Sequence, residues 1–210
     1  DVLRIEMIGP AWVQKLATSL RTSEVLSVLV DGMRWDVWRF LRERLLQDLP
    51  GTWRLAGERL TWARLPTTTE TQLERLRGPG RGEIVAVDRV VSREEYLRRR
   101  SAGGIGAVAG LIVKLDFVDH RIHTFRESLY ELYREALIGA EIHLRGLLEG
   151  LPVGSLAVIF ADHGFREDPA FDPTRRYETT RYTHGGDHFL EVLAPAAAIF
   201  AVVLATNVLG

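Results

Sequence analysis

Two short apolar runs, each followed by an aspartate, constrain the fold of this chain most. Val25–Val30 is rich in branched residues and leads into Asp31 and a glycine. Leu156–Ala161 is similarly apolar and leads into Asp162 and His163. Runs this short and this branched predict buried strands rather than helices. Ligands bind at the carboxyl ends of strands in open α/β sheets, so both runs are expected to deliver polar groups to a site.

Helical and strand patterns alternate along the rest of the chain. Apolar residues at helical spacing predict helices over 12–20, 33–49 and 124–148, and a short charged helix over 92–100. Further strands are predicted over 53–65 (as one or two short strands), 84–91, 111–117 and 196–204. With no internal repeat, this alternation predicts one layered α/β/α sandwich over residues 1–210 with a mostly parallel central sheet.

Composition narrows the class of protein. The chain has 27 basic and 28 acidic side chains, a net charge of −1, so no overall field directs it to nucleic acid or a membrane. It has no cysteine, which excludes disulfides, thiolate metal sites and a cysteine nucleophile, and which fits a cytoplasmic protein. The closing apolar run is interrupted by Pro195, so it predicts a core strand and a turn rather than a membrane span. Because the chain opens at Asp1 without methionine, we expect a piece of a longer protein.

Carboxylates and imidazoles recur beside the predicted strand ends. The candidate metal ligands are Asp31, Asp119, His123, Asp162, His163 and His184. Aspartate and histidine without thiolate suit zinc or manganese. The spacing of Asp119 and His123 puts both on one face if that segment is helical. Each motif alone is more often a turn, a cap or polar surface, but together they predict a metal centre.

A threonine-rich loop follows the second predicted stretch of strand. The segment 65–72 reads Leu-Pro-Thr-Thr-Thr-Glu-Thr-Gln, with four threonines in five positions. Hydroxyl side chains are good N-caps, and a helix N-terminus favours anions. The loop is therefore expected to enter a helix and to offer a hydroxyl to the site.

Taken together, these stretches resemble the PglZ domain, a branch of the alkaline phosphatase superfamily. The matching segments, in the order of the superfamily, are 28–36, 65–69, 117–123, 161–165 and 184–186. The resemblance spans most of the chain, and it implies an alkaline-phosphatase-like sandwich formed by a single catalytic domain.

The resemblance also implies a site with two divalent metal ions. One ion would be held by Asp119, His123 and His184, and the other by Asp31, Asp162 and His163. The superfamily nucleophile is a serine or threonine between the ions, and in relatives that cleave phosphodiesters it follows a proline by three residues. Counting from Pro66 gives Thr69, with Thr68 and Thr67 as the second and third candidates. A divalent metal lowers the pKa of such a hydroxyl and makes it nucleophilic.

Three further candidate site residues leave alternatives open. Arg34 follows the first ligand and either touches phosphate or lies on a helix surface. His120 competes with His123 as an imidazole ligand from the same segment. His188 can replace or assist His184.

The function that the resemblance implies is metal-dependent cleavage of a nucleotide or nucleic-acid phosphodiester, with zinc or manganese as cofactor. PglZ-like proteins belong to bacterial phage-defence systems of the BREX kind, so the implied partners are a DNA methyltransferase and ATPases. Alternatives are a phosphomonoesterase of the same superfamily and a non-catalytic scaffold domain of a defence complex. A sulfatase is disfavoured, because Thr69 is not the modified cysteine or serine that sulfatases use.

Overall fold

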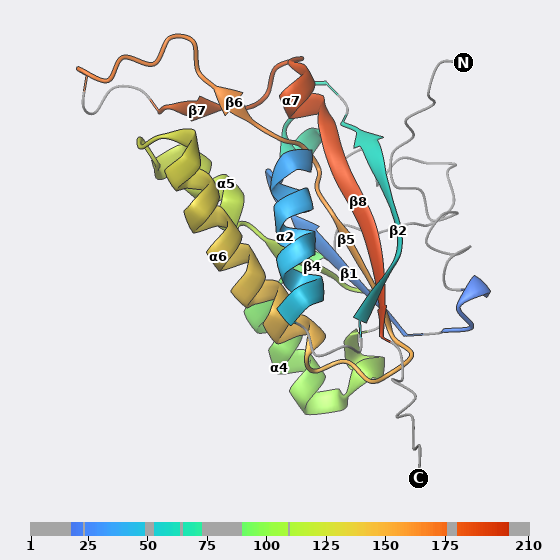
Figure 1. The fold of residues 1–210 in the computed structure, drawn as a ribbon. Helices are drawn as coiled ribbons and strands as arrows, with labels where there is room; N and C mark the ends of the chain where they lie inside the picture. The colour runs from blue at the N-terminus through green and yellow to red at the C-terminus, as the bar shows by residue number, and fades with distance from the viewer. Residues whose placement is uncertain are drawn as a thin grey trace, which may run out of the picture.

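The structure is a computed structural model that describes residues 18–22, 24–48, 53–63, 65–72, 90–108, 110–175 and 180–201. Within these residues, six strands form one mixed sheet in the order β2-β8-β5-β1-β4-β3 (Figure 1). The strands are β1 (Val25–Val30), β2 (Trp53–Trp62), β3 (Val90–Ser92), β4 (Ile112–Leu115), β5 (Leu156–Phe160) and β8 (Leu193–Ala201). A separate two-stranded ribbon pairs β6 (Arg166–Glu167) with β7 (Tyr182–Thr183).

The central part of the sheet is parallel. β1 pairs in parallel with both β4 and β5, and β3 adds to β4 in the same direction. β8 runs antiparallel to β5, and β2 runs antiparallel to β8. The predicted α/β class with a mostly parallel central sheet is therefore confirmed.

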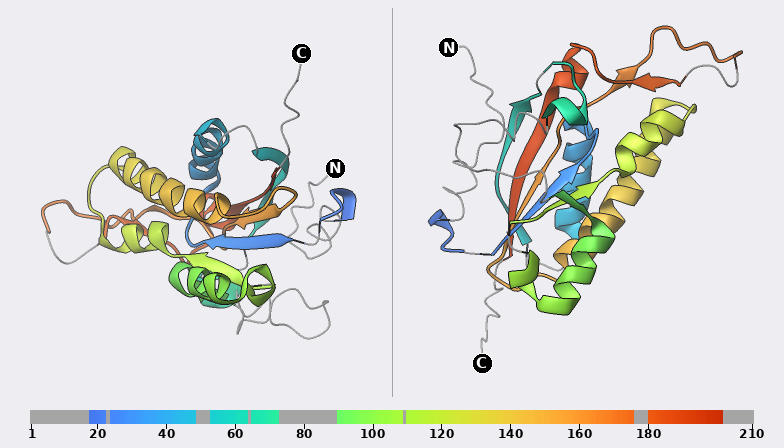
Figure 2. Two further views of the ribbon diagram at one scale, coloured as in Figure 1. Left: turned by 90° about the horizontal axis from the view of Figure 1, so that it is seen from below. Right: turned by 180° about the vertical axis from the view of Figure 1, so that it is seen from behind.

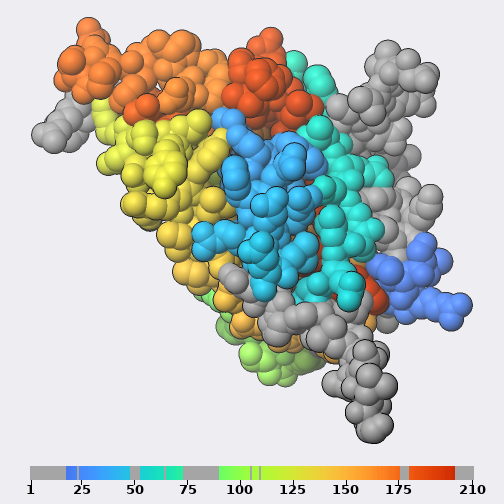
Figure 3. All heavy atoms as spheres, in the orientation of Figure 1, coloured from blue at the N-terminus to red at the C-terminus, as the bar shows by residue number. Residues whose placement is uncertain are grey.

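Helices flank this sheet. They are α2 (Trp35–Asp48), α4 (Arg93–Gly103), the 3₁₀ helix η2 (Ile105–Val108), α5 (Phe117–Thr124), α6 (Leu129–Leu148) and α7 (Phe189–Val192). Helices α2 and α6 lie together on one face of the sheet (Figure 2). Their outer surfaces adjoin in the space-filling view (Figure 3). None of the helices in the described ranges is long and apolar enough to cross a membrane.

The main core lies between these two helices and the sheet. Trp38 of α2 and Leu144 of α6 are fully buried against Val28 of β1 and Val113 of β4. The opposite face carries a smaller cluster that includes Val158 and is flanked by partly buried side chains. The helix predicted over 12–20 falls mostly outside the described residues, which begin at 18, where two residues are helical.

The carboxyl ends of the parallel strands gather at one edge of the sheet. Val30 is the last residue of β1 and pairs with Leu115, the last residue of β4. Leu29 of β1 pairs with Phe160, the last residue of β5. The segments that follow β1, β4 and β5 therefore start side by side, although they are far apart in the sequence (Figure 1).

The structure corrects the predicted elements between 111 and 148. The strand ends at Leu115 rather than at 117, and residues 117–124 form the helix α5, which places Asp119 and His123 on successive turns. The long helix begins at Leu129 rather than at 124, because Ser128 caps it. The Ser128 hydroxyl accepts a hydrogen bond from the Glu131 amide at 3.3 Å, as in the Ser-x-x-Glu signature of a helix start.

Other predicted bounds hold with smaller changes. Within the stretch 53–65, Trp53–Trp62 form one strand, β2, with an irregular register between Leu55 and Gly57. β3 covers only the end of the strand predicted over 84–91, and residues 84–89 lie outside the described ranges. β8 starts at Leu193, three residues before the predicted start, and 202–204 again lie outside the described ranges.

Candidate metal centre

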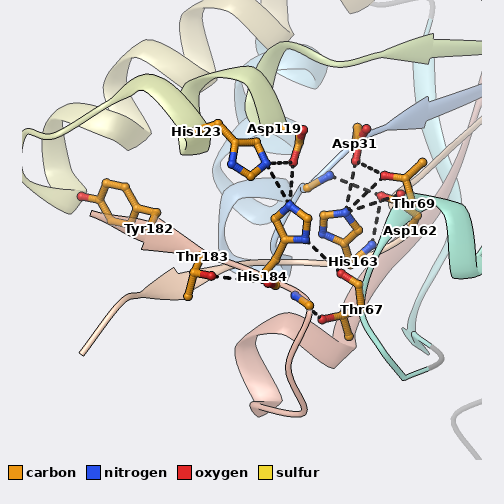
Figure 4. A network of polar contacts seen from close by, with 12 residues as sticks. Asp31, Thr67, Thr69, Asp119, His123, Asp162, His163, Tyr182, Thr183 and His184 are labelled. Carbon is orange, nitrogen blue, oxygen red and sulfur yellow. Dashed lines mark hydrogen bonds and ion pairs between the residues drawn. The ribbon is translucent and has the colours of Figure 1, made fainter. Parts of the chain in front are cut away.

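Asp31 stands at the centre of the site, in the turn that follows β1. Its side chain is buried, and its backbone amide donates to the Leu115 carbonyl at 2.9 Å, which ties the turn to β4. Its Oδ1 accepts a hydrogen bond from the Thr69 hydroxyl at 2.9 Å and lies 3.3 Å from His163 Nε2. Its Oδ2 pairs with Lys114 Nζ at 2.6 Å. The two carboxylate oxygens therefore face different partners, and Figure 4 shows the contacts with Thr69 and His163.

Asp162 and His163 follow β5 and meet Asp31 from the neighbouring strand. Asp162 Oδ1 accepts hydrogen bonds from the amides of His163 at 3.0 Å and of Gly32 at 3.3 Å. His163 is completely buried, and its Nδ1 lies 2.9 Å from the Gly164 carbonyl. A carbonyl only accepts, so Nδ1 carries a proton. Nε2 faces Asp31, to which it donates a hydrogen bond when the ring is protonated, and it presents a lone pair when the ring is neutral.

Asp119, His123 and His184 form a second group beside the first. Asp119 Oδ1 lies 3.3 Å from His123 Nε2 and 3.2 Å from His184 Nε2. The two Nε2 atoms are 3.0 Å apart. His123 and Asp119 come from successive turns of α5, whereas His184 comes from the loop after β7 (Figure 4).

Hydrogen bonds outside the second group fix the orientation of His184. Its Nδ1 lies 3.1 Å from the Thr67 carbonyl, so the proton belongs on Nδ1 and Nε2 turns toward Asp119. The ring also stacks on His163, with centroids 4.3 Å apart. Outer contacts of this kind set the tautomer and ring direction of histidines that bind metals.

The donor set fits divalent cations. One possible ligand atom from each of Asp119, His123 and His184 lies within 4.8 Å of the other two. The same holds for Asp31, Asp119 and His163. Asp119 therefore lies within ligand range of both sets of residues, whereas Asp162, which the resemblance places with Asp31 and His163, is in neither set of three. Asp119 Oδ1 and Asp162 Oδ2 are buried acceptors that lack a hydrogen-bond donor anywhere in the described part of the chain. Buried acceptors without a donor are costly, and a cation among them would remove that cost.

The electrostatics of the first group point the same way. Burial raises the pKa of Asp162, with His163 opposing and Asp31 adding to the effect. Burial works against ionised Asp31 as well, but hydrogen bonds from His163 and Lys114 hold its pKa well below the ordinary value. Burial also disfavours charged His163, yet the carboxylates of Asp162 and Asp31 raise its pKa to about 9. This cluster attracts positive charge, which a proton or a metal ion can supply.

The three candidate threonines have different surroundings. Thr67 is fully buried, and its Oγ1 lies 3.0 Å from both the Gly186 carbonyl and Glu191 Oε2. Thr68 accepts a hydrogen bond from the Thr71 amide at 3.3 Å, as an N-cap does, and residues 69–72 are helical. The hydroxyl of Thr69 alone, among these three, contacts Asp31 and His163.

Gly32 allows α5 to come close to β1. It adopts φ +72°, and a Cβ there would lie 3.0 Å from Ile122 Cδ1 and 3.5 Å from the backbone of Asp119. Glycine alone takes this conformation without strain and leaves room for the helix. The Asp-Gly pair at the strand end thus brings Asp119 next to Asp31.

The remaining candidates lie away from the two groups. Arg34 is buried rather than on a helix surface, and its guanidinium pairs with Asp36, with Nη2–Oδ2 at 2.6 Å. His120 is exposed on α5 and belongs to neither group. His188 caps α7, where its Nδ1 accepts from the Leu190 amide at 3.3 Å. His123 and His184 are the imidazoles that the structure brings to Asp119.

Two further residues, whose roles the sequence alone did not indicate, shape the site. Lys114 holds Asp31, and it is a single basic residue inside an apolar strand. Glu191 is fully buried and accepts from Thr67 Oγ1, from the Gly186 amide at 2.6 Å and from Arg166 Nε at 2.6 Å. The available signal was a lone charge within an apolar run, which indicates a buried ion pair when the run is a core element.

Comparison with models of known protein families finds no match to this chain, and a search of curated proteins finds none either.

Proposed function

We propose that this chain is a divalent-metal-dependent phosphodiesterase with Thr69 as its nucleophile. The observation that carries the proposal is the contact of the Thr69 hydroxyl with Asp31 Oδ1 at 2.9 Å and with His163 Nε2 at 3.4 Å. A hydroxyl that meets a carboxylate and an imidazole beside a second Asp/His group has the surroundings that an activated nucleophile needs.

Each residue has a part in this proposal. Asp31, Asp162 and His163, which contact one another, would hold one ion, and Asp119, His123 and His184 the other. Asp119 also lies within ligand range of Asp31 and His163. Divalent ions held there would lower the pKa of the hydroxyl and neutralise charge on the phosphoryl group. Asp31 orients the Thr69 hydroxyl by accepting its hydrogen bond. The metal expected from these donors is zinc, with manganese as the alternative.

The substrate class is proposed from the resemblance of the motifs to PglZ domains. It favours a phosphodiester of a nucleotide or nucleic acid, and a place in phage defence beside a methyltransferase and an ATPase. Because Arg34 is buried and its guanidinium already pairs with Asp36, we assign it a role in packing rather than in phosphate recognition. A cation for the phosphoryl oxygens then has to come from the metal centre itself.

A comparison of three chromogenic esters tests the proposal. Bis-p-nitrophenyl phosphate, p-nitrophenyl phosphate and p-nitrophenyl sulfate are each supplied with purified protein loaded with zinc or manganese. We expect the diester to be hydrolysed with the highest kcat/KM. Preference for the monoester would support the phosphomonoesterase alternative. Binding of less than about one divalent ion per chain would support the scaffold alternative.

A further inference from the structure

Lys114 makes a short ion pair with the central carboxylate of the site. Its Nζ lies 2.6 Å from Asp31 Oδ2, and the Asp31 side chain is only 2% exposed against 32% for Lys114. The pair joins neighbouring strands, because Lys114 stands beside Leu29 in the register of β4 and β1. Burial of the Lys114 amine disfavours its charge, but the hydrogen bond and charge of Asp31, together with the charges of Asp162 and Asp116, raise its pKa.

The ion pair gives the two Asp31 oxygens different partners. Oδ2 is held by Lys114, and Oδ1 is left to face Thr69 and His163. A carboxylate with one oxygen occupied can offer a cation only the other. The ammonium also carries a positive charge next to a cluster whose other members attract cations.

We propose that Lys114 is a positioning residue of the metal centre that makes Asp31 a ligand through Oδ1 alone. In doing so it keeps Oδ1 pointed at Thr69, and its charge limits how tightly the Asp31 group binds a cation. The effect on metal affinity stands on the ion pair itself, whereas the effect on turnover rests on the proposed function.

Two substitutions at this position should change metal affinity in opposite directions. Lys114→Gln removes the charge and frees Oδ2, so both Asp31 oxygens can bind one ion, and we expect one zinc ion to bind about tenfold more tightly. Lys114→Arg introduces a planar guanidinium that can hold both carboxylate oxygens, so we expect that zinc ion to bind about tenfold more weakly. Loss of general folding would not produce this pair of opposite shifts.

Zinc affinity is measured by competition with a chromogenic chelator, and hydrolysis of bis-p-nitrophenyl phosphate is measured on the same samples. The matched control is Arg121→Gln, which removes a positive charge from α5 whose partner, Glu135, lies 3.9 Å away and outside the metal centre. For Lys114→Gln we expect a kcat about tenfold lower at similar KM, because Oδ1 is no longer fixed toward Thr69. The control should match the wild-type protein in both measurements.

Each outcome has a stated meaning. Zinc affinity in Lys114→Gln equal to that of Arg121→Gln, or weaker than wild type, would overturn the proposal. If Lys114→Gln does not fold, Lys114→Arg with unchanged zinc affinity would overturn it as well. If the wild-type protein hydrolyses none of the esters, the proposed function fails, while the shifts in zinc affinity still decide the place of Lys114.

Discussion

Thr69 Oγ1 donates a hydrogen bond to Asp31 Oδ1 over 2.9 Å, although 38 positions separate the two residues along the chain. The contact joins the end of β1 to the loop that follows β2, on opposite sides of β5 and β8 in the sheet order. It gives one hydroxyl of the threonine-rich loop a different environment from its neighbours. Variants of these threonines should therefore behave differently.

Thr69→Ala should abolish hydrolysis, with a fall in kcat of at least about 10³-fold, because it removes the oxygen that we propose as the nucleophile. Metal content, measured by elemental analysis, should stay largely intact, since the alanine removes no Asp or His donor. Thr68→Ala is the matched control: it removes an N-cap, which costs about 1 kcal/mol of stability, and should leave kcat nearly unchanged. Equal activity of Thr69→Ala and the wild-type protein would refute the nucleophile assignment.

Asp119→Ala should lower the occupancy of both metal ions, whereas His123→Ala should lower the occupancy of one. The reason is that Asp119 contributes to both Asp/His groups and His123 to only one. The number of zinc ions bound per chain, measured after dialysis at a fixed zinc concentration, distinguishes the two cases. Identical loss in both variants would mean that Asp119 serves a single ion.

Thr67→Val should destabilise the fold without touching the reacting group. The substitution keeps the shape of the side chain but leaves the Gly185 amide, now 2.9 Å from Thr67 Oγ1, without its acceptor. A buried donor left unpaired costs about 1–3 kcal/mol. Chemical denaturation should report this loss, and zinc binding should weaken with it, because the Gly185 amide that loses its acceptor directly follows His184 in the chain. Unchanged stability would show that the two loops do not depend on this hydroxyl.

Stability of the protein treated with a chelator should fall as pH rises above neutrality. The pKa of His163 is raised in the fold from 6.5 to about 9, so its protonated form stabilises the fold fully below about pH 6.5. That contribution, of order 3 kcal/mol for a buried group, is lost by about pH 9. Thermal melting between pH 6 and 9.5 checks it, with His163→Gln as the variant in which the slope should flatten. The lowered pKa of Asp31 has its effect at the acid end of the pH range. Its ionised carboxylate stabilises the fold at neutral pH, and this contribution to stability is lost only in strong acid.

Zinc should oppose this trend. Its ligands must be unprotonated, so the increase in melting temperature on adding zinc should grow from pH 6 to pH 9. A zinc-induced shift that is constant across this range would mean that His163 gives up no proton on binding.

Much of the architecture follows from local pattern. The buried strands at Val25–Val30 and Leu156–Phe160 were predictable because branched apolar runs of this length have few alternatives. The approach of Asp119 to Asp31 followed from the convergence of parallel strand ends once the strands were assigned. Helix α5 was not predicted as an element of its own, and the start of α6 was placed too early in the chain, because the cap at Ser128 decides that boundary.

The polar support of the site was harder to predict. Lys114 and Glu191 act through partners more than twenty residues away, and a single sequence does not pair such distant charges. The choice among three adjacent threonines likewise depended on which backbone groups the loop after β7 offers to Thr67. Tertiary contacts, rather than local propensity, decide such cases.

Glu191 links several loops through its buried carboxylate and its backbone carbonyl. Its side chain receives Thr67 and the Gly186 amide, and its backbone carbonyl receives the Gly164 amide at 2.8 Å. The threonine loop, the turn carrying His163 and the segment carrying His184 thus share one anchor. To open the site for an incoming molecule, these three segments would have to move together. Moving one metal-binding residue away at a time is therefore unfavourable.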